Sequence, residues 1–360
     1  MWKNTKFTKL LGLELPIVQG PFGGRISSVG LTSTVSNAGG LGSYGCQPLY
    51  AHEIISVAER IRRKTKKPFN LNLWVKDRDD NTNSFDENAF QEVIQIFQPY
   101  FDEVGAVPPT FPLSESPIFE NQIEAIFEVK PDVFSFVYGI PSQDILEKCR
   151  ELKIKTVGTA TTLDEAIAME SAGVDVLVVS GFDAGGHRVS FLDKPEESLV
   201  GTFSLIPQVA DHVNLPIIGA GGIADSRGLK AAFALGAHAV QIGTAFLATQ
   251  ESGTSDLHRE TLFAKEARYT TLTKAFTGRL SRGIKNRLTE ELKEFHNKFA
   301  PYPLQSKIVG ALGAYPASLG SSPELNSFWA GQAAPILKYH KANDLIKSIV
   351  AEMNNDRRFI

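Results

Sequence analysis

Residues 178–188 read VVSGFDAGGHR. The apolar start of this segment is typical of a buried parallel strand. Gly185 and Gly186 follow, and because they lack a Cβ they let the backbone approach a bound ligand closely. His187 then lies just past the strand end, where α/β enzymes place catalytic groups, and an unperturbed histidine titrates near neutrality. We therefore predict His187 as the catalytic residue, with a solvated loop histidine as the alternative.

Similar apolar runs recur along the chain and alternate with amphipathic stretches, which indicates repeated βα units. The predicted strands are Leu15–Gln19, Leu41–Tyr44, Phe69–Val75, Val133–Tyr138, Lys155–Thr159, Val176–Ser180, Pro216–Ala220 and Ala239–Thr244. The predicted helices include Ala51–Arg63, Ile118–Val129, Asp144–Leu152, Leu163–Ala172 and Ser226–Leu235, with Thr162 or Asp164 and Asp225 or Ser226 as caps. Eight strands separated by helices predict an α/β fold of the (β/α)₈ TIM-barrel type. An open doubly wound sheet is the structural alternative.

Two segments depart from this alternation. Residues 76–112 are too long for an ordinary βα loop, so we expect an insertion after strand 3 that walls the active-site face. The last third of the chain has helical signals at Thr289–Phe299 and Ala333–Met353 but no further βα cycle. We therefore expect a barrel over residues 1–250 and a helical C-terminal extension over 251–360, packed together as one structural unit.

Composition excludes several classes of protein. A net charge of −3 gives no electrostatic basis for binding nucleic acid or an anionic membrane. The two cysteines, Cys46 and Cys149, cannot form a disulfide framework, and no Cys/His spacing indicates a metal site. The N-terminus lacks a secretory signal, and no apolar run is long enough to span a bilayer. We expect a soluble cytoplasmic protein whose C-terminal helices either form a homodimer surface or cap the barrel.

Three further glycine-rich or polar segments follow predicted strands and point to one ligand. The sequence QGPFGG, from Gln19 onward, offers a rigid surface for a flat ring, although an ordinary βα turn is the alternative. GAGGI at 219–223 and QIGT at 241–244 end strands seven and eight, where barrels commonly bind phosphate through backbone N–H groups. The side-chain amide of Asn72 is suited to hydrogen bonding with the edge of a pyrimidine ring. The alternative is a core amide whose hydrogen bonds are all made within the protein. A flat ligand that carries a phosphate fits flavin mononucleotide (FMN).

Blocks across nearly the whole chain carry a family resemblance. They are PIVQGPFGG, VSNAGGLGSYG, KPFNLNLWV, DVFSFVYGIP, DAGGHR, GTFSLIPQV, PIIGAGGIADSRG, AVQIGTAFLAT, SRGIKNRL, YPLQ and FWAGQAA. In these blocks the chain resembles the class I nitronate monooxygenases, formerly called 2-nitropropane dioxygenases. The resemblance implies noncovalent FMN and the oxidation of nitronates by O₂ to a carbonyl compound and nitrite. The resemblance also implies propionate 3-nitronate as the substrate and detoxification as the physiological role.

The resemblance also assigns residues. It implies that Asn72, Gly185, Gly222 and the segment 241–244 contact FMN, and that His187 binds the nitro group or removes a proton from a neutral nitroalkane. Ser180 stands where the family usually has glutamine, so its flavin contact differs. The predicted cofactor-binding residues are Gln19, Gly20, Pro21, Phe22, Asn72, Ser180, Gly185, Gly186, Gly221, Gly222, Gln241, Ile242, Gly243 and Thr244. An FMN-dependent enoyl-thioester reductase and a non-catalytic flavin-binding barrel are the functional alternatives.

Overall fold

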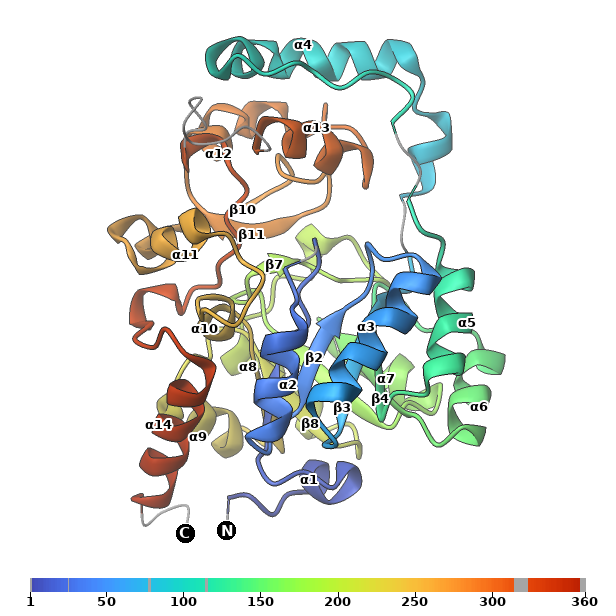
Figure 1. The fold of residues 1–360 in the computed structure, drawn as a ribbon, viewed down its shortest axis with the longest axis vertical. Helices are drawn as coiled ribbons and strands as arrows, with labels where there is room; N and C mark the ends of the chain where they lie inside the picture. Colours follow the sequence, from blue (N-terminus) through green and yellow to red (C-terminus); the bar gives the residue numbers. More distant parts are fainter. Residues whose placement is uncertain (1, 25, 77–78, 114–115, 314–322, 357–360) are drawn as a thin grey trace.

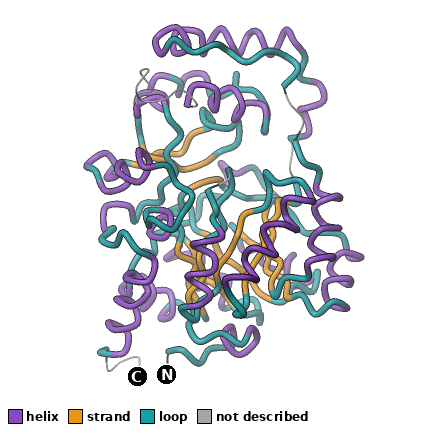
Figure 2. Tube along the Cα trace, viewed as in Figure 1, coloured by secondary structure: helices purple, strands orange, loops and turns teal. Residues whose placement is uncertain are grey.

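The computed structural model describes residues 2–24, 26–76, 79–113, 116–313 and 323–356. Eight parallel strands form a barrel with helices outside it (Figures 1 and 2). These strands are β1 (Ile17–Gln19), β2 (Gly42–Gly45), β3 (Phe69–Trp74), β4 (Val133–Val137), β5 (Lys155–Ala160), β6 (Val176–Ser180), β8 (Ile217–Ala220) and β9 (Ala239–Ile242). Each of the eight predicted strands is present, so the TIM-barrel prediction is confirmed.

The order of the strands explains how the barrel closes. The sheet runs β1-β9-β8-β6-β5-β4-β3-β2, and β1 therefore pairs with the last strand of the cycle. Two hydrogen bonds connect β1 and β2, the strands at the two ends of this order. The Gln19 N–H donates to the Leu41 carbonyl oxygen (2.9 Å), and the Leu41 N–H donates to the Ile17 carbonyl oxygen (2.9 Å). These bonds bring β2 against β1, and the open-sheet alternative is excluded.

The helices connect the strands and cover the barrel. They are α1 (Lys6–Leu11), α2 (Val29–Asn37), α3 (Ala51–Lys64), α4 (Glu87–Val104), α5 (Phe119–Val129), α6 (Gln143–Glu151), α7 (Leu163–Ser171), α8 (Thr202–Ala210), α9 (Ser226–Ala234), α10 (Thr244–Leu247), α11 (Asp256–Phe263), α12 (Arg287–Glu291), α13 (Leu304–Gly313) and α14 (Ala342–Asn354). Two expected caps are present: the side chain of Thr162 accepts from the Glu165 N–H, and that of Asp225 accepts from the Arg227 N–H. None of these helices, within the described ranges, is long and apolar enough to cross a membrane.

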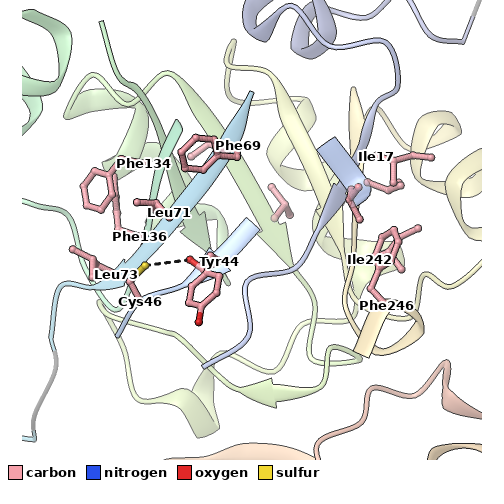
Figure 3. Close-up of a cluster of buried hydrophobic side chains, with 14 of the residues drawn as sticks. Ile17, Tyr44, Cys46, Phe69, Leu71, Leu73, Phe134, Phe136, Ile242 and Phe246 are labelled. Carbon is pink, nitrogen blue, oxygen red and sulfur yellow. Dashed lines mark hydrogen bonds between the residues drawn. The ribbon is translucent and has the colours of Figure 1, made fainter. Parts of the chain in front are cut away.

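Side-chain alternation along the strands separates two layers of core. Phe69, Leu71 and Leu73 of β3 point outward and join the large cluster under the helices, together with Phe134 and Phe136 of β4 (Figure 3). The intervening residues, such as Asn70 and Asn72, face the barrel interior. The lower interior is filled by a separate apolar cluster, which includes Val18, Val133 and Val176 and extends to Phe7 of α1.

A second hydrophobic cluster lies above the barrel mouth. It combines α4, from the predicted insertion, with the C-terminal segment, through side chains such as Phe97, Phe101, Phe276 and Ile308. In Figure 1, α4 lies beyond α12 and α13 on the side away from the barrel. The insertion after β3 is thus present, and it packs on the C-terminal segment rather than standing alone.

The C-terminal segment differs from its prediction in two ways. It contains two antiparallel strands, β10 (Thr270–Thr273) and β11 (Ser281–Ile284), which pair in the order β10-β11-β7, where β7 is Gly186–His187. The helix predicted at Ala333–Met353 is wrong in its first half: a 3₁₀ turn occupies Ala334–Ile336, extended residues follow, and α14 begins only at Ala342. Pro335 explains this break, because proline fits a first helical turn but interrupts a helix interior.

The helix predicted at Thr289–Phe299 is also shorter than expected. Its α-helical part starts at Arg287, where the Asn286 side chain accepts from the Thr289 N–H as a cap. It ends at Glu291, and a 3₁₀ turn at Lys293–Phe295 follows.

Candidate active site

The glycine turns at the ends of β6, β8 and β9 lie against one another. Gly221 and Gly222 have φ values of 107° and 66°, the left-handed region that favours glycine. A Cβ on Gly221 would lie 3.3 Å from the Ala184 nitrogen, so the turn after β8 packs on the loop that leads to His187. The Gly331 N–H donates to Thr244 Oγ1 (2.9 Å), and Gly331 also packs on Gly185, so it links the turn after β9 to the loop of His187. Turns that are distant in sequence therefore meet at one end of the barrel.

Gly243 leaves open space in this group of turns. A Cβ built on Gly243 would meet no protein atom within 4 Å, and the same holds for Gly186. By contrast, a Cβ on Gly20 would lie 3.3 Å from Gly243 Cα, so the turn after β1 is packed directly against the turn after β9. Thr244 begins the short helix α10, in which the Phe246 and Leu247 N–H groups donate to the Gly243 carbonyl oxygen (2.9 and 3.0 Å), so the N–H groups of Thr244 and Ala245 precede the first intrahelical bonds. This cradle of exposed backbone fits a phosphate-bearing ligand.

Three of the predicted cofactor-binding residues are hydrogen-bonded to, or packed against, other parts of the protein. Gln19 Oε1 accepts from the Ser43 N–H (2.9 Å), and Gln19 Nε2 donates to the Gly20 carbonyl oxygen (2.5 Å). Ile242 points outward and joins the core under the helices, as Figure 3 shows. A Cβ on Gly185 would lie 2.5 Å from the Gly331 nitrogen. Any contact that these residues make with a cofactor therefore comes from backbone atoms.

Polar side chains line the upper barrel interior near this cradle. Asn72 Nδ2 donates to Ser135 Oγ (2.9 Å), and Asn70 Nδ2 donates to the same oxygen (2.8 Å). Gln241 of β9 is in register with Ala220 of β8, and Ala220 is in register with Ser180 at the carboxyl end of β6. The structure thus places the predicted Asn72, Ser180 and Gln241 around one end of the barrel interior.

The remaining predicted residues of the first turn lie at the same end. The Phe22 N–H donates to Ser27 Oγ (3.1 Å), and the same hydroxyl donates to the Phe22 carbonyl oxygen (2.9 Å), so the turn that contains Pro21 and Phe22 is held from within. A Cβ on Gly23 would lie 3.6 Å from the ring of Trp74 at the end of β3. The first glycine turn therefore reaches the surroundings of His187 described next.

His187 is held over the barrel mouth by the small antiparallel sheet. It pairs with Ser281 of β11, and the next residue, Arg188, donates its N–H to the Leu280 carbonyl oxygen (2.9 Å). The imidazole Nε2 lies 2.9 Å from Thr277 Oγ1. His187 is therefore a positioned side chain and not a solvated loop residue.

Four aromatic rings surround the imidazole. Ring centroids lie 5.0 Å away for Trp74, 5.4 Å for Trp329, 5.9 Å for Tyr302 and 6.4 Å for Tyr138. Their segments belong to blocks that carry the family resemblance, but the sequence alone assigned them no role, because they come from four distant parts of the chain. A flat, partly apolar substrate is the kind of molecule that such a ring-lined site accepts.

Burial changes the protonation of His187. Desolvation, assisted by the positive charge of Arg279, lowers its pKa to about 3. The pKa near neutrality that the sequence suggested is therefore wrong for the free protein, and the imidazole is neutral at physiological pH. A neutral imidazole has one N–H donor and one acceptor nitrogen, so it either donates to a nitro oxygen or accepts a proton.

The neighbouring Arg188 has a structural task. It is 1% exposed, and its guanidinium donates to the carbonyl oxygens of Ser180 (3.0 Å) and Ser198 (2.7 Å). Burial lowers its pKa to about 10, which still leaves it charged at neutral pH. Arg188 therefore ties the histidine loop to the end of β6.

Cys46 lies at the end of β2, next to Tyr44 in Figure 3. Its side chain is fully buried, and burial raises the pKa of its thiol. A thiol that stays protonated is a poor nucleophile, so Cys46 serves as a small core residue.

Comparisons with known proteins agree with this geometry. The family model for nitronate monooxygenase matches residues 4–352. A probable nitronate monooxygenase of Staphylococcus aureus (strain MSSA476) is 37% identical over 98% of both chains. The structure of a nitroalkane oxidase from Streptomyces ansochromogenes is similar, with a TM-score of 0.88 and 29% identity over 98% of this chain and 99% of that one. FabK from Thermotoga maritima is also similar, with a TM-score of 0.75 and 28% identity over 98% and 96% of the two chains. The chain belongs to the nitronate monooxygenase family of oxidoreductases.

Proposed function

We propose that this protein binds FMN and oxidises short alkyl nitronates, of which propionate 3-nitronate is the expected one, with O₂ to a carbonyl compound and nitrite. One observation carries the proposal: a neutral, oriented histidine lies at the mouth of a barrel whose glycine turns form an open backbone cradle. The cradle is suited to a phosphate, and the histidine is suited to a nitro group.

The residues present fit FMN. Gly243 offers space that a Cβ would occupy, and the backbone around Gly222 and Thr244 supplies N–H groups for phosphate. Asn72 faces the upper barrel interior, where its amide would pair with the pyrimidine edge of the isoalloxazine ring. When bound, FMN would supply the acceptor for electrons from the nitronate and their transfer to oxygen.

The protein's own residues would orient the substrate. A nitronate is already deprotonated at the α-carbon, so His187 needs only to donate its Nδ1–H to a nitro oxygen, with Nε2 accepting from Thr277. For a neutral nitroalkane the other tautomer is required, because Nδ1 must then accept the α-proton. The aromatic rings around His187 would limit the access of water and favour a flat substrate.

Oxygen uptake and nitrite release by the purified protein test this proposal. With propionate 3-nitronate we expect both, and NADPH should leave the flavin oxidised. Rapid reduction of the flavin by NADPH, without nitrite from any nitronate, would instead support the enoyl-thioester reductase. Bound FMN that reacts with neither would support the non-catalytic alternative.

A further inference from the structure

Glu165 is a fully buried acidic residue that is bonded to the segment following His187. It lies in the first turn of α7, directly after β5, and its side chain is 0% exposed. Its Oε2 accepts from the Thr161 N–H (2.6 Å) and from Thr161 Oγ1 (2.7 Å). Its Oε1 accepts from the N–H groups of Phe191 (2.6 Å) and Leu192 (3.3 Å). An ionised carboxylate only accepts hydrogen bonds, so it suits these four donors, and it joins the end of β5 to residues 191–192.

The short segment between His187 and these bonds is held as well. Val189 packs against the rings that surround the imidazole, namely the cluster of Trp74, Tyr138 and Tyr302. Ser190 Oγ lies 2.7 Å from Thr161 Oγ1 and donates to it, because the one hydroxyl proton of Thr161 goes to Glu165. The contacts of Glu165 are therefore linked to His187 through consecutive residues, each of which is fixed in place.

Arg188 places a second buried charge in this segment. Burial lowers the pKa of Arg188 to about 10, and the negative charge of Glu165 is the strongest influence that opposes this change. Its Nε has no hydrogen-bond partner among the residues that the structure describes, so the hydrogen bonds satisfy this guanidinium only in part. Glu165 therefore offsets the charge of the residue next to His187, in addition to holding the backbone of residues 191–192.

A neutral side chain of the same shape cannot replace this carboxylate. In Glu165→Gln the amide oxygen would accept from one pair of donors, but the amide NH₂ would face the other pair. Buried donors that lose their acceptor cost free energy, and a shift of the segment that follows His187 would relieve this cost. Misplacement of a reacting group by about 1 Å can lower a rate roughly 100-fold.

We propose that Glu165 is a positioning residue for His187. Its carboxylate fixes residues 190–192, directly and through Thr161, and thereby keeps the imidazole at Thr277 in the orientation that meets the nitro group. The inference rests on the proposed function, which supplies the nitronate at His187.

Two glutamate variants of the same helix test the assignment. Glu170 is the matched control, because its Oε1 also accepts a backbone N–H, that of Asn214 (2.7 Å), but at the other end of α7. In Glu165→Gln we expect kcat per bound flavin with propionate 3-nitronate to fall roughly tenfold or more, with a smaller change in KM, because the nitro-binding group is misaligned. Glu170→Gln should keep the kcat of the unmodified protein.

The melting temperature and the flavin content of each variant identify the other outcomes. A lower melting temperature with unchanged kcat per bound flavin in Glu165→Gln would mean that Glu165 only stabilises the fold, and would overturn the positioning role. Loss of FMN from this variant would place its effect at the cofactor, and equal losses of kcat in both variants would make it nonspecific. Each of these results would also contradict the assignment.

The imidazole ¹⁵N signals of His187 separate this inference from the proposed function. They are identified as the signals that His187→Asn lacks, and they report the tautomer and the hydrogen bond of the ring without turnover. We expect them to shift in Glu165→Gln and to stay in place in Glu170→Gln. A shift in a protein that turns over no nitronate would support the positioning role and contradict the proposed function alone.

Ser190→Ala is a second variant, because it removes only the hydroxyl that donates to Thr161 and leaves Glu165 intact. We expect it to move the His187 signals in the same direction as Glu165→Gln, but less. If Glu165→Gln does not fold, Ser190→Ala decides the question. Unchanged His187 signals in the folded variant would overturn the positioning role.

Discussion

His187 Nε2 lies 2.9 Å from Thr277 Oγ1, and the same hydroxyl lies 3.3 Å from the Arg279 carbonyl oxygen. When Thr277 donates to that carbonyl, it accepts from His187 Nε2–H, and Nδ1 is left as a base. When Thr277 donates to Nε2, the imidazole presents Nδ1–H as a donor. One threonine can therefore support both protonation patterns that the two substrate classes require.

Replacement of this threonine should separate the two substrate classes. In Thr277→Val the Nε2–H loses its acceptor, so the tautomer with Nδ1 as base is disfavoured. We expect kcat/KM for 1-nitropropane to fall about tenfold more than kcat/KM for its nitronate, within the range assigned to general-base effects. Thr261→Val, outside the site, is a control, because the Thr261 hydroxyl donates to the Leu257 carbonyl oxygen of its own helix. Equal losses on the two substrates would argue against a tautomer-setting role.

Removal of the imidazole itself should have a larger effect. His187→Asn is expected to lower turnover of any nitro substrate by roughly 10² or more, the range typical of a lost acid–base group. Initial rates of nitrite release measure this, with the flavin content of each preparation determined first. Full activity in a flavin-loaded variant would show that another residue holds the nitro group.

The lowered pKa of His187 predicts a pH dependence of stability. Its folded-state value of about 3 lies below the ordinary 6.5, so between these values the unfolded chain binds the proton more readily. The free energy of unfolding should therefore decrease as pH falls from 6.5 towards 3, by at most about 1.4 kcal/mol per pH unit from this residue. Urea unfolding at pH 7.5 and pH 5 should show a larger loss for the unmodified protein than for His187→Asn. The same loss in both proteins would indicate an ordinary, unshifted histidine.

The open space at Gly243 predicts a variant that folds without cofactor. In Gly243→Leu the new side chain meets no protein atom close to its Cβ, but it occupies the cradle that we assign to phosphate. We expect a protein with an unchanged circular dichroism spectrum that purifies colourless. Gly310→Ala is the control, because its Cβ also meets open space but lies on α13, and this variant should stay yellow. A yellow, FMN-saturated Gly243→Leu protein would place the phosphate elsewhere.

The barrel was predictable from sequence because its strands are short apolar runs at regular spacing. Lys155–Ala160 and Val176–Ser180, for example, deviate from prediction by one residue at most. The antiparallel sheet was missed for a physical reason. Its strand β10 reads TTLT and is only half-buried, so it has neither an apolar run nor a clear alternation.

The site could be predicted only in part for a similar reason. Glycines and a histidine at strand ends carry a local signal, so the sequence predicts His187 and the turns around Gly222 and Gly243 as site residues. Thr277 contacts His187 across 90 residues, and Arg279 contacts Asp79 across 200. Such pairs have no local pattern, because they form only when β11 pairs with β7 and when the insertion packs on the C-terminal segment.

The most direct test of the central claim is the visible spectrum of the purified protein, mixed with propionate 3-nitronate in the absence of oxygen. We predict an oxidised-flavin spectrum that bleaches on mixing and returns when air is admitted, with nitrite released. An oxidised-flavin spectrum that stays unchanged, or a protein without flavin, would contradict the account.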